Sequence, residues 1–206
     1  MTAASTVRNR TVRVTGGVLA TAALAGCAAN TGGTPFPVET AMTAASASAK
    51  AAQLPARPAE LPLTGVEPCD LMAQVNLDEL KITSVPRMAA NPQDGPTCVL
   101  DADKTPPFHA YHLRAVPADL QEWVTGTRRK TSMTTEPKTI SGYPALTNYR
   151  AAGTPSDCET LVGVANGQTL AVQAFAVTGG QFTQAQLCDM SAKAADLSLQ
   201  TLKARN

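Results

Sequence analysis

The sequence predicts an α+β fold, in which a mostly antiparallel sheet is packed by helices. Two segments with alternating apolar residues flank Asn166-Gly167, a dipeptide that favours the two-residue turn of a β-hairpin. The segment that begins near Thr183 instead repeats leucine and alanine at helical spacing. Four cysteines lie in the same part of the chain and indicate two disulfides. We therefore expect one folded domain at residues 61–206.

The N-terminus has the features of a secretory signal peptide, which we assign to residues 1–26. Three arginines precede a run of small and apolar residues that ends in Leu24-Ala25-Gly26-Cys27. These last four residues resemble the bacterial lipobox, in which the cysteine is lipidated. The apolar run is shorter than the roughly 20 residues that a membrane-spanning helix needs. We therefore expect cleavage before Cys27, which becomes the lipidated first residue of the mature chain.

Residues 27–60 are predicted to form a disordered tether that carries the lipid at Cys27. Alanine, threonine, serine, proline and glycine dominate this stretch, and large apolar residues are rare. Such a composition buries too little apolar surface to offset the entropy that is lost on ordering. A flexible chain of about 34 residues has a root-mean-square span of roughly 30–40 Å. The tether would hold the domain close to a membrane surface.

Charge and composition argue against a nucleic-acid partner. The chain after residue 26 keeps 14 Lys and Arg against 16 Asp and Glu, a formal charge of −2. A face that binds nucleic acid would need an excess of basic side chains for the phosphates. Beyond the N-terminus, no apolar run is long enough to span a membrane. The membrane is therefore expected as a partner through the lipid on Cys27.

The first elements of the domain are predicted to be helical. Pro68 suits the first position of a helix, because its missing N–H would be unpaired there. Asn76, with Glu79 three residues later, is a candidate cap for a short continuation. Turn-forming residues indicate a loop over residues 86–97. A short strand is expected at residues 98–100.

The middle of the domain is predicted to alternate between strand, helix and loop. Residues 108–116 have the pattern of a strand. Residues 117–124 are predicted to be a helix, because a proline begins the segment and a glycine follows it. The polar and charged residues 127–138 indicate a loop. Residues 140–149 are expected to form a strand, a turn near Pro144 and a second strand.

The C-terminal third carries the clearest signals. A hairpin is predicted over residues 158–177, with Asn166-Gly167 as its turn. Thr183 and Gln186 have the spacing of a helix capping box. Apolar residues at helical spacing follow it: Leu187, Met190, Ala194, Leu197. We expect this last helix to lie on the sheet with its apolar face toward the core.

Setting Cys27 apart leaves an even number of cysteines, which indicates two disulfides in an exported domain. They are Cys69, Cys98, Cys158 and Cys188. Of the three possible pairings, chain order favours that of neighbours: Cys69–Cys98 and Cys158–Cys188. Each closes a loop of about thirty residues, a constraint worth roughly 3–4 kcal/mol. The alternatives are free thiols or a four-thiolate zinc site, although structural zinc sites usually use closely spaced cysteine pairs, which this chain lacks.

Several of these features together resemble a family of actinobacterial lipoproteins known as domain of unknown function 3558. The motifs are the lipobox, the Ala/Pro-rich tether, Gly65-Val66-Glu67-Pro68-Cys69-Asp70-Leu71-Met72, Gly142-Tyr143-Pro144-Ala145, Cys158 before the Asn-Gly hairpin, and Cys188 in the last helix. One departure is Cys98-Val99-Leu100, where the family often has Cys-x-Trp. The resemblance implies a secreted, membrane-tethered α+β domain, with a fold like that of the photosystem-accessory and Ran-binding Mog1 proteins. It implies no catalytic residue.

A search for reactive groups yields few candidates. Only two histidines are present, and a spacing of three in a strand puts His109 and His112 on opposite faces of a sheet. The sequence has no catalytic serine elbow, no zinc-protease motif and no phosphate-binding glycine loop. We therefore predict no catalytic residue, metal or cofactor. The basic run Arg128-Arg129-Lys130 is a candidate contact for an anionic surface, and a solvated loop is the alternative.

These observations predict a non-enzymatic lipoprotein of the cell envelope, anchored on the outer face of the cytoplasmic membrane. Its expected activity is binding, with an envelope or secreted protein as the first candidate partner. The alternative is a carrier or sensor of a lipid or small apolar ligand, held between the sheet and the last helix. A cavity at that place would favour the ligand, whereas a fully packed sheet face would favour the protein partner.

Overall fold

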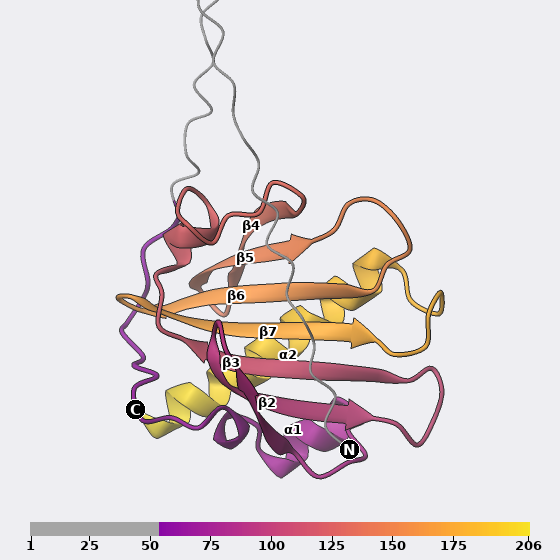
Figure 1. Ribbon diagram of the computed structural model, residues 1–206. Helices are drawn as coiled ribbons and strands as arrows, with labels where there is room; N and C mark the ends of the chain where they lie inside the picture. Colours follow the sequence, from indigo (N-terminus) through magenta and orange to yellow (C-terminus); the bar gives the residue numbers. More distant parts are fainter. Residues whose placement is uncertain (1–53) are drawn as a thin grey trace, which may run out of the picture. The chain divides into compact units, whose positions relative to one another are not determined.

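The computed structural model describes residues 54–206, and these residues form one seven-stranded sheet with a long helix on one face (Figure 1). The strands are β1 (Arg87–Asn91), β2 (Gly95–Ala102), β3 (His109–Val116), β4 (Thr134–Ile140), β5 (Tyr143–Tyr149), β6 (Asp157–Ala165) and β7 (Gln168–Ala176). Their order across the sheet is β1-β2-β3-β7-β6-β5-β4, and every neighbouring pair is antiparallel. The predicted α+β fold class is confirmed.

Helices lie on both sides of this sheet. They are η1 (Pro68–Leu71), α1 (Gln74–Glu79), η2 (Leu120–Trp123) and α2 (Gln184–Arg205), where η marks a 3-10 helix. α2 lies against β6 and β7 on one face, as Figure 1 shows. η2 packs on the opposite face, where Gly163 lets it approach, because a Cβ on this glycine would lie 3.2 Å from the Cβ of Leu120. No helix in the described part of the chain is long and apolar enough to span a membrane.

α2 forms where the sequence predicts it, because its start is capped. The Thr183 side chain accepts the N–H of Gln186 at 3.2 Å, and the Gln186 side chain accepts the N–H of Thr183 at 2.8 Å. The predicted capping box is therefore confirmed. Along the helix, Leu187, Ala194 and Leu202 are fully buried. α2 thus covers the sheet face to which alternate strand residues contribute an apolar core.

Alternation along the strands gives the sheet two different faces. In β3, Tyr111 and Leu113 belong to the main core beneath α2. Arg114 and Val116 occupy the opposite face of the same strand. A smaller core lies there beneath η2, and it consists of Val116, Leu120, Trp123, Leu146, Leu161 and Ala171.

Both predicted disulfides are present, Cys69–Cys98 and Cys158–Cys188. The first joins η1 to β2, and the second joins β6 to the early part of α2. Cys98 and Cys158 are fully buried in their strands. The two bridges therefore tie helical segments to the sheet from inside the core.

Two segments that the sequence predicts as loops contain strands. Residues 86–97 include all of β1 and the start of β2, joined by a turn after Asn91. β4 begins at Thr134, inside the loop predicted over residues 127–138. Both predictions are wrong because β1 and β4 are the edge strands, and neither has a row of buried residues. Without a buried face, a strand lacks the alternation of apolar residues by which it is recognised.

Three smaller predictions are also corrected. The turn between β4 and β5 lies at Ser141-Gly142, and Pro144 lies inside β5. Both turn residues have positive φ, as a two-residue hairpin turn of this type requires. The helix predicted over residues 117–124 is only the four-residue η2, capped by Asp119. Asn76 does not cap α1, because it lies inside the helix.

Residues 1–53 carry the predicted signal peptide, Cys27 and most of the tether, and they lie outside the described residues. The last residues of the predicted tether contact the domain. Leu54 packs beside the core under η2, and Glu60 accepts the backbone N–H of Asn166 at 2.7 Å. Contacts with the domain therefore begin several residues before its predicted start.

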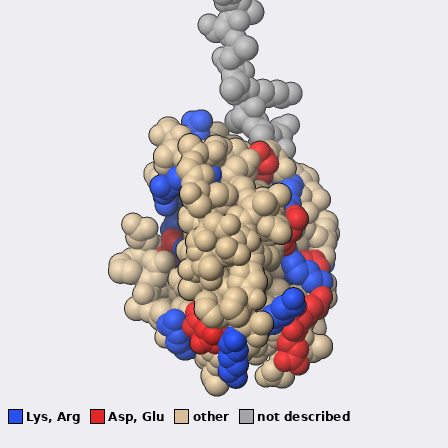
Figure 2. Space-filling view, turned by 90° about the vertical axis from the view of Figure 1, so that its right-hand side faces the viewer, with Lys and Arg blue, Asp and Glu red and all other residues tan. Residues whose placement is uncertain are grey.

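Charged side chains of both signs are interspersed on the face shown in Figure 2. This view looks at the end of the molecule that carries the β2–β3 and β7–α2 loops, on the right-hand side of Figure 1. The charged side chains lie mainly toward the margins, and the centre of the view is uncharged. This face therefore presents no extended patch of a single charge sign.

Candidate ligand-binding site

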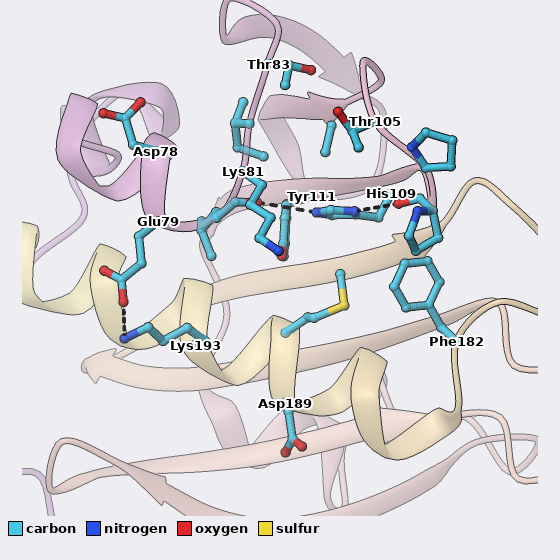
Figure 3. A pocket seen from close by; sticks show the side chains of 16 residues that line it. Asp78, Glu79, Lys81, Thr83, Thr105, His109, Tyr111, Phe182, Asp189 and Lys193 are labelled. Carbon is cyan, nitrogen blue, oxygen red and sulfur yellow. Dashed lines mark hydrogen bonds and ion pairs between the residues drawn. The ribbon is translucent and has the colours of Figure 1, made fainter.

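A pocket of about 760 Å³ lies on the α2 side of the domain, where the end of α1, the β2–β3 loop and α2 meet (Figure 3). Its wall is mainly apolar, and these side chains line it: Leu80, Ile82, Pro106, Pro107, Tyr111, Phe182, Met190. A concave, mostly apolar hollow with a few polar groups is the usual form of a small-molecule site. This corner is therefore the candidate functional site.

Tyr111 is the most deeply buried polar side chain of the pocket. Its position in β3 directs the ring toward α2, and only 2% of the residue is exposed. Burial raises the pKa of the Tyr111 phenol well above its usual range, so the hydroxyl stays protonated. Within residues 54–206, this hydroxyl makes no hydrogen bond. Tyr111 is thus a neutral donor that faces the pocket without a partner.

His109 joins two walls of the pocket. Its ring lies edge-on to Tyr111 and Phe182, with centroid distances of 5.5 and 5.9 Å. Its Nδ1 is 3.2 Å from the carbonyl oxygen of Pro107, and its Nε2 is 3.4 Å from that of Leu80. His109 therefore connects the β2–β3 loop to the end of α1 and closes one side of the pocket.

α1 ends in a hydrogen-bonding pattern that places Lys81 at the pocket. The N–H of Ile82 donates to the carbonyl of Leu77 at 2.9 Å, and the N–H of Lys81 donates to that of Asp78 at 3.1 Å. This is the Schellman arrangement, whose left-handed residue is usually glycine. Lys81 has a φ of 59°. A residue with a Cβ costs about 1 kcal/mol in this conformation.

The charged side chains of the pocket differ in direction and pairing. Lys193 forms an ion pair with Glu79 at 2.6 Å, and this hydrogen bond raises the pKa of Lys193. In Figure 3 the carboxylates of Asp78 and Asp189 point away from the centre of the pocket. The amino group of Lys81 points inward in the same view. Lys81 is an exposed residue, and its amino group forms no ion pair within the described residues, although the lining also holds three carboxylates.

A second pocket, of about 660 Å³, lies on the opposite face of the sheet and is polar. At its base the Arg114 guanidinium donates to Asp94 at 2.9 Å, to Gln173 at 3.2 Å, and to Glu159. The Arg114 side chain is 9% exposed, and its Nε is buried without a partner among the described residues. Arg128 also pairs with Asp94. These residues form a buried ion-pair network that fixes the β1–β2 hairpin and the η2–β4 loop on the sheet.

The three basic residues that are predicted to contact an anionic surface differ in exposure and in pairing. Arg128 is half-buried, pairs with Asp94 and lies 4.9 Å above the ring of Trp123. Arg129 and Lys130 are exposed. The surface contact stays a prediction, and it now concerns mainly Arg129 and Lys130.

The histidines of the described chain are held by contacts within the protein itself. Within residues 54–206, no group of three His, Cys, Asp or Glu side chains could hold a metal ion. The ring nitrogens of His109 contact backbone carbonyls. His112 packs on Phe175 with a centroid distance of 4.5 Å on the opposite face, which confirms that the two histidines face different sides. The pocket beneath α2 therefore offers an apolar wall together with the hydroxyl of Tyr111 and the amino group of Lys81, neither of which is paired within the described residues.

Sequence reasoning does not identify the residues of this pocket. Lys81 follows α1, Tyr111 lies in β3 and Met190 lies in α2, and no sequence motif connects them. Helical spacing predicts Met190 for the core, whereas the structure places it partly exposed at the pocket. The one available signal is a lysine directly after a short helix, at a position where glycine is usual.

Comparison with known proteins identifies the family of the chain. The sequence pattern of the family described as Protein of unknown function (DUF3558) matches residues 22–201. No curated protein and no solved structure matches the chain. The matched range includes all seven strands, both disulfides and the residues of both pockets. The chain therefore belongs to the DUF3558 family.

Proposed function

We propose that this protein is a lipid-anchored binding protein of the cell envelope, and that the pocket beneath α2 holds a small, mostly apolar ligand. One observation carries the proposal, namely the pocket of about 760 Å³ with its apolar wall. Sites for small molecules usually have volumes of roughly 300–1,000 Å³. The two candidate partners are a small ligand and another protein, and a cavity between the sheet and the last helix favours the ligand.

The surroundings of the pocket support a preformed site. Tyr111 lies in β3, which is hydrogen-bonded on both sides by β2 and β7. Cys188 is bonded to Cys158 two residues before Met190, so this bridge fixes the part of α2 that lines the pocket. A rigid frame lowers the entropic cost of binding, because little has to be ordered when the ligand arrives.

The proposed anchor rests on the N-terminal sequence. Three arginines, an apolar run and Leu24-Ala25-Gly26-Cys27 have the order of a lipoprotein signal. The family match begins at residue 22, so it includes this motif. All other cysteines are in disulfides, which leaves Cys27 as the cysteine that a lipid can occupy. The lipid would hold the domain on the outer face of the membrane.

Binding of the neutral fluorophore N-phenyl-1-naphthylamine tests the ligand proposal. The probe becomes bright in apolar surroundings, and we expect saturable binding to the full chain carrying Cys27→Ala and exported so that its disulfides form. Met190→Trp fills the pocket and is expected to weaken binding about tenfold or more. Thr154→Trp places the same side chain on an exposed loop and is the matched control. Equal binding by the two variants would exclude this pocket as the site.

Fractionation of the native host tests the anchor independently. Two acyl chains hold a protein stably on a membrane, whereas one gives only marginal binding. Cys27→Ala is therefore expected to move the protein from the membrane fraction to the soluble fraction. A variant that still sediments with membranes after signal cleavage would refute the lipid anchor and leave the ligand proposal untouched.

A further inference from the structure

We propose that the pocket beneath α2 selects a single-chain ligand with one carboxylate, bound by the Tyr111 hydroxyl and the Lys81 ammonium group. The inference rests on the proposed function and names the ligand class for the same pocket. The expected ligand is a fatty-acid-like molecule, whose chain lies against the apolar wall and whose carboxylate accepts hydrogen bonds from both groups.

Tyr111 supplies a hydrogen-bond donor that no residue from 54 to 206 uses. Only 2% of the residue is exposed, yet its hydroxyl bonds to no residue of the described chain. The hydroxyl is not among the fully buried polar atoms, so it keeps access to the pocket, where a bound ligand that excluded water would have to supply its hydrogen-bond partner. Burial also holds the pKa of the phenol high, so the group stays protonated and can donate a hydrogen bond to an acceptor. A ligand oxygen at this point would satisfy the hydroxyl.

Lys81 occupies a backbone position that favours glycine. Its φ of 59° completes the Schellman ending of α1. Strained residues of this kind concentrate at binding and catalytic sites. In Figure 3 the Lys81 side chain extends from the end of α1 into the pocket, toward the side where Tyr111 lies. A donor and a cation from two separate elements thus face the same hollow.

The other charged groups leave room for a single negative charge. Lys193 is already paired with Glu79, and Asp78 and Asp189 point away from the centre of the pocket. A monocarboxylate would therefore match Lys81 alone. A doubly charged phosphate would need a second unpaired cation, and the described lining provides none. The lining carries two lysines against three carboxylates, so the preference for a monocarboxylate rests on the inward direction of Lys81 and not on the net charge.

The apolar wall provides the place for the chain of the ligand. Ile82, Phe182 and Met190 line the pocket from three different segments. Transfer of the chain out of water drives binding, while the polar group fixes its direction. The site therefore combines a non-directional apolar contact with one oriented carboxylate.

Isothermal titration calorimetry with decanoate and decan-1-ol tests this inference. The two ligands have the same chain and differ in their charge, and both are used below the concentration at which they aggregate. The protein is the full chain carrying Cys27→Ala. We expect decanoate to bind about tenfold more tightly than decan-1-ol, because hydrogen bonds to charged groups are stronger than those to neutral groups.

Two variants measure the contributions of the two donors to decanoate affinity separately. Tyr111→Phe removes only the hydroxyl, so we expect about a tenfold loss of decanoate affinity with an unchanged melting temperature. Lys81→Gly removes the charge and relieves the strained backbone. It is expected to weaken decanoate binding about fivefold and to raise the melting temperature by about 2–4 °C. Lys81→Met keeps the aliphatic stem and is the matched control, with the same loss of affinity and no gain in melting temperature.

The outcomes distinguish this inference from the proposed function. Equal affinities of the unmodified pocket for decanoate and decan-1-ol would overturn the carboxylate inference and leave an apolar binding site. Binding of neither ligand would overturn both. A preference for decanoate that persists in Tyr111→Phe and in Lys81→Met would place the carboxylate elsewhere, and it would also overturn the inference.

Discussion

The two faces of the sheet use alternate residues of the same strands and bury very different side chains. Beneath α2 the core is apolar, and a mostly apolar pocket opens at its edge. On the opposite face a small apolar core adjoins the buried ion pairs of Arg114. In β3 these environments are one residue apart, because Leu113 belongs to the first and Arg114 to the second.

This difference indicates which face can accept a ligand. In the polar pocket, the terminal nitrogens of Arg114 are already bound by Asp94, Glu159 and Gln173. A ligand there would have to compete with strong pairs inside the protein. In the pocket beneath α2, the Tyr111 hydroxyl and the Lys81 ammonium group have no partner within the described residues. We therefore assign a stabilising role to the ion-pair face and propose that a ligand binds at the helix face.

The largest expected effect comes from breaking the ion-pair network. Arg114→Leu leaves Glu159 as a mostly buried charge without a cation and leaves Asp94 paired with Arg128 alone, and we expect the free energy of unfolding to fall by about 3–5 kcal/mol. Urea unfolding measures this loss. Arg87→Leu breaks an exposed pair with Asp101 and is the control, with an expected loss below about 1 kcal/mol. Similar losses in the two variants would show that the ion pairs of Arg114 stabilise the fold no more than an exposed ion pair does.

Removing the disulfide of α2 tests the other face. The double substitution Cys158→Ser and Cys188→Ser opens a loop with a sequence separation of 30 residues. The entropy regained by the unfolded chain is expected to lower the free energy of unfolding by about 3–4 kcal/mol. Removing Cys69–Cys98, with a separation of 29, should cost nearly as much. A negligible loss for the α2 bridge would mean that packing alone holds the helix.

A smaller effect is expected at the start of α2. Thr183→Ala removes the side-chain oxygen that accepts the N–H of Gln186, and we expect a loss of about 1 kcal/mol in thermal or urea unfolding. Thr183→Ser keeps the oxygen and should retain most of the stability. An alanine variant as stable as the serine variant would argue that the capping box does not stabilise this face.

The smallest effect is a pH dependence on the ion-pair face. Burial, and then the nearby charge of Arg114, lower the pKa of His112 below its ordinary value of 6.5. His112 therefore binds a proton more readily in the unfolded chain than in the folded one. Its contribution to stability is complete above pH 6.5 and is lost as the pH falls through the pKa of the folded state. When the pH is lowered from about 7.5 to about 5, the melting temperature of His112→Gln should fall less than that of the unmodified chain. An identical loss would contradict this assignment.

The parts of the fold that the sequence predicts are those with local causes. The Asn166-Gly167 hairpin needs only its turn and the flanking alternation. The start of α2 depends on Thr183 and Gln186, three residues apart. The pairing Cys158–Cys188 follows chain order. The hairpin and the helix start are decided by residues close together in the sequence, and the disulfide pairing is decided by the order of the cysteines along the chain.

The parts that the sequence does not predict depend on distant residues or lack a buried face. β1 and β4 are edge strands whose sequences carry no apolar alternation. The contact of Arg114 with Glu159 joins residues 45 positions apart. The pocket combines Lys81, Tyr111 and Met190 through packing alone. No local sequence pattern predicts that these side chains lie close together.

Methyl NMR spectra during a titration with decanoate test the central claim most directly, because they observe both faces in one experiment. Ile82 and Met190 report on the pocket beneath α2, whereas Leu146 and Leu161 report on the opposite face. We predict saturable shift changes at the first pair and none at the second. Changes confined to Leu146 and Leu161, or no change at either pair, would contradict the assignment of ligand binding to the helix face.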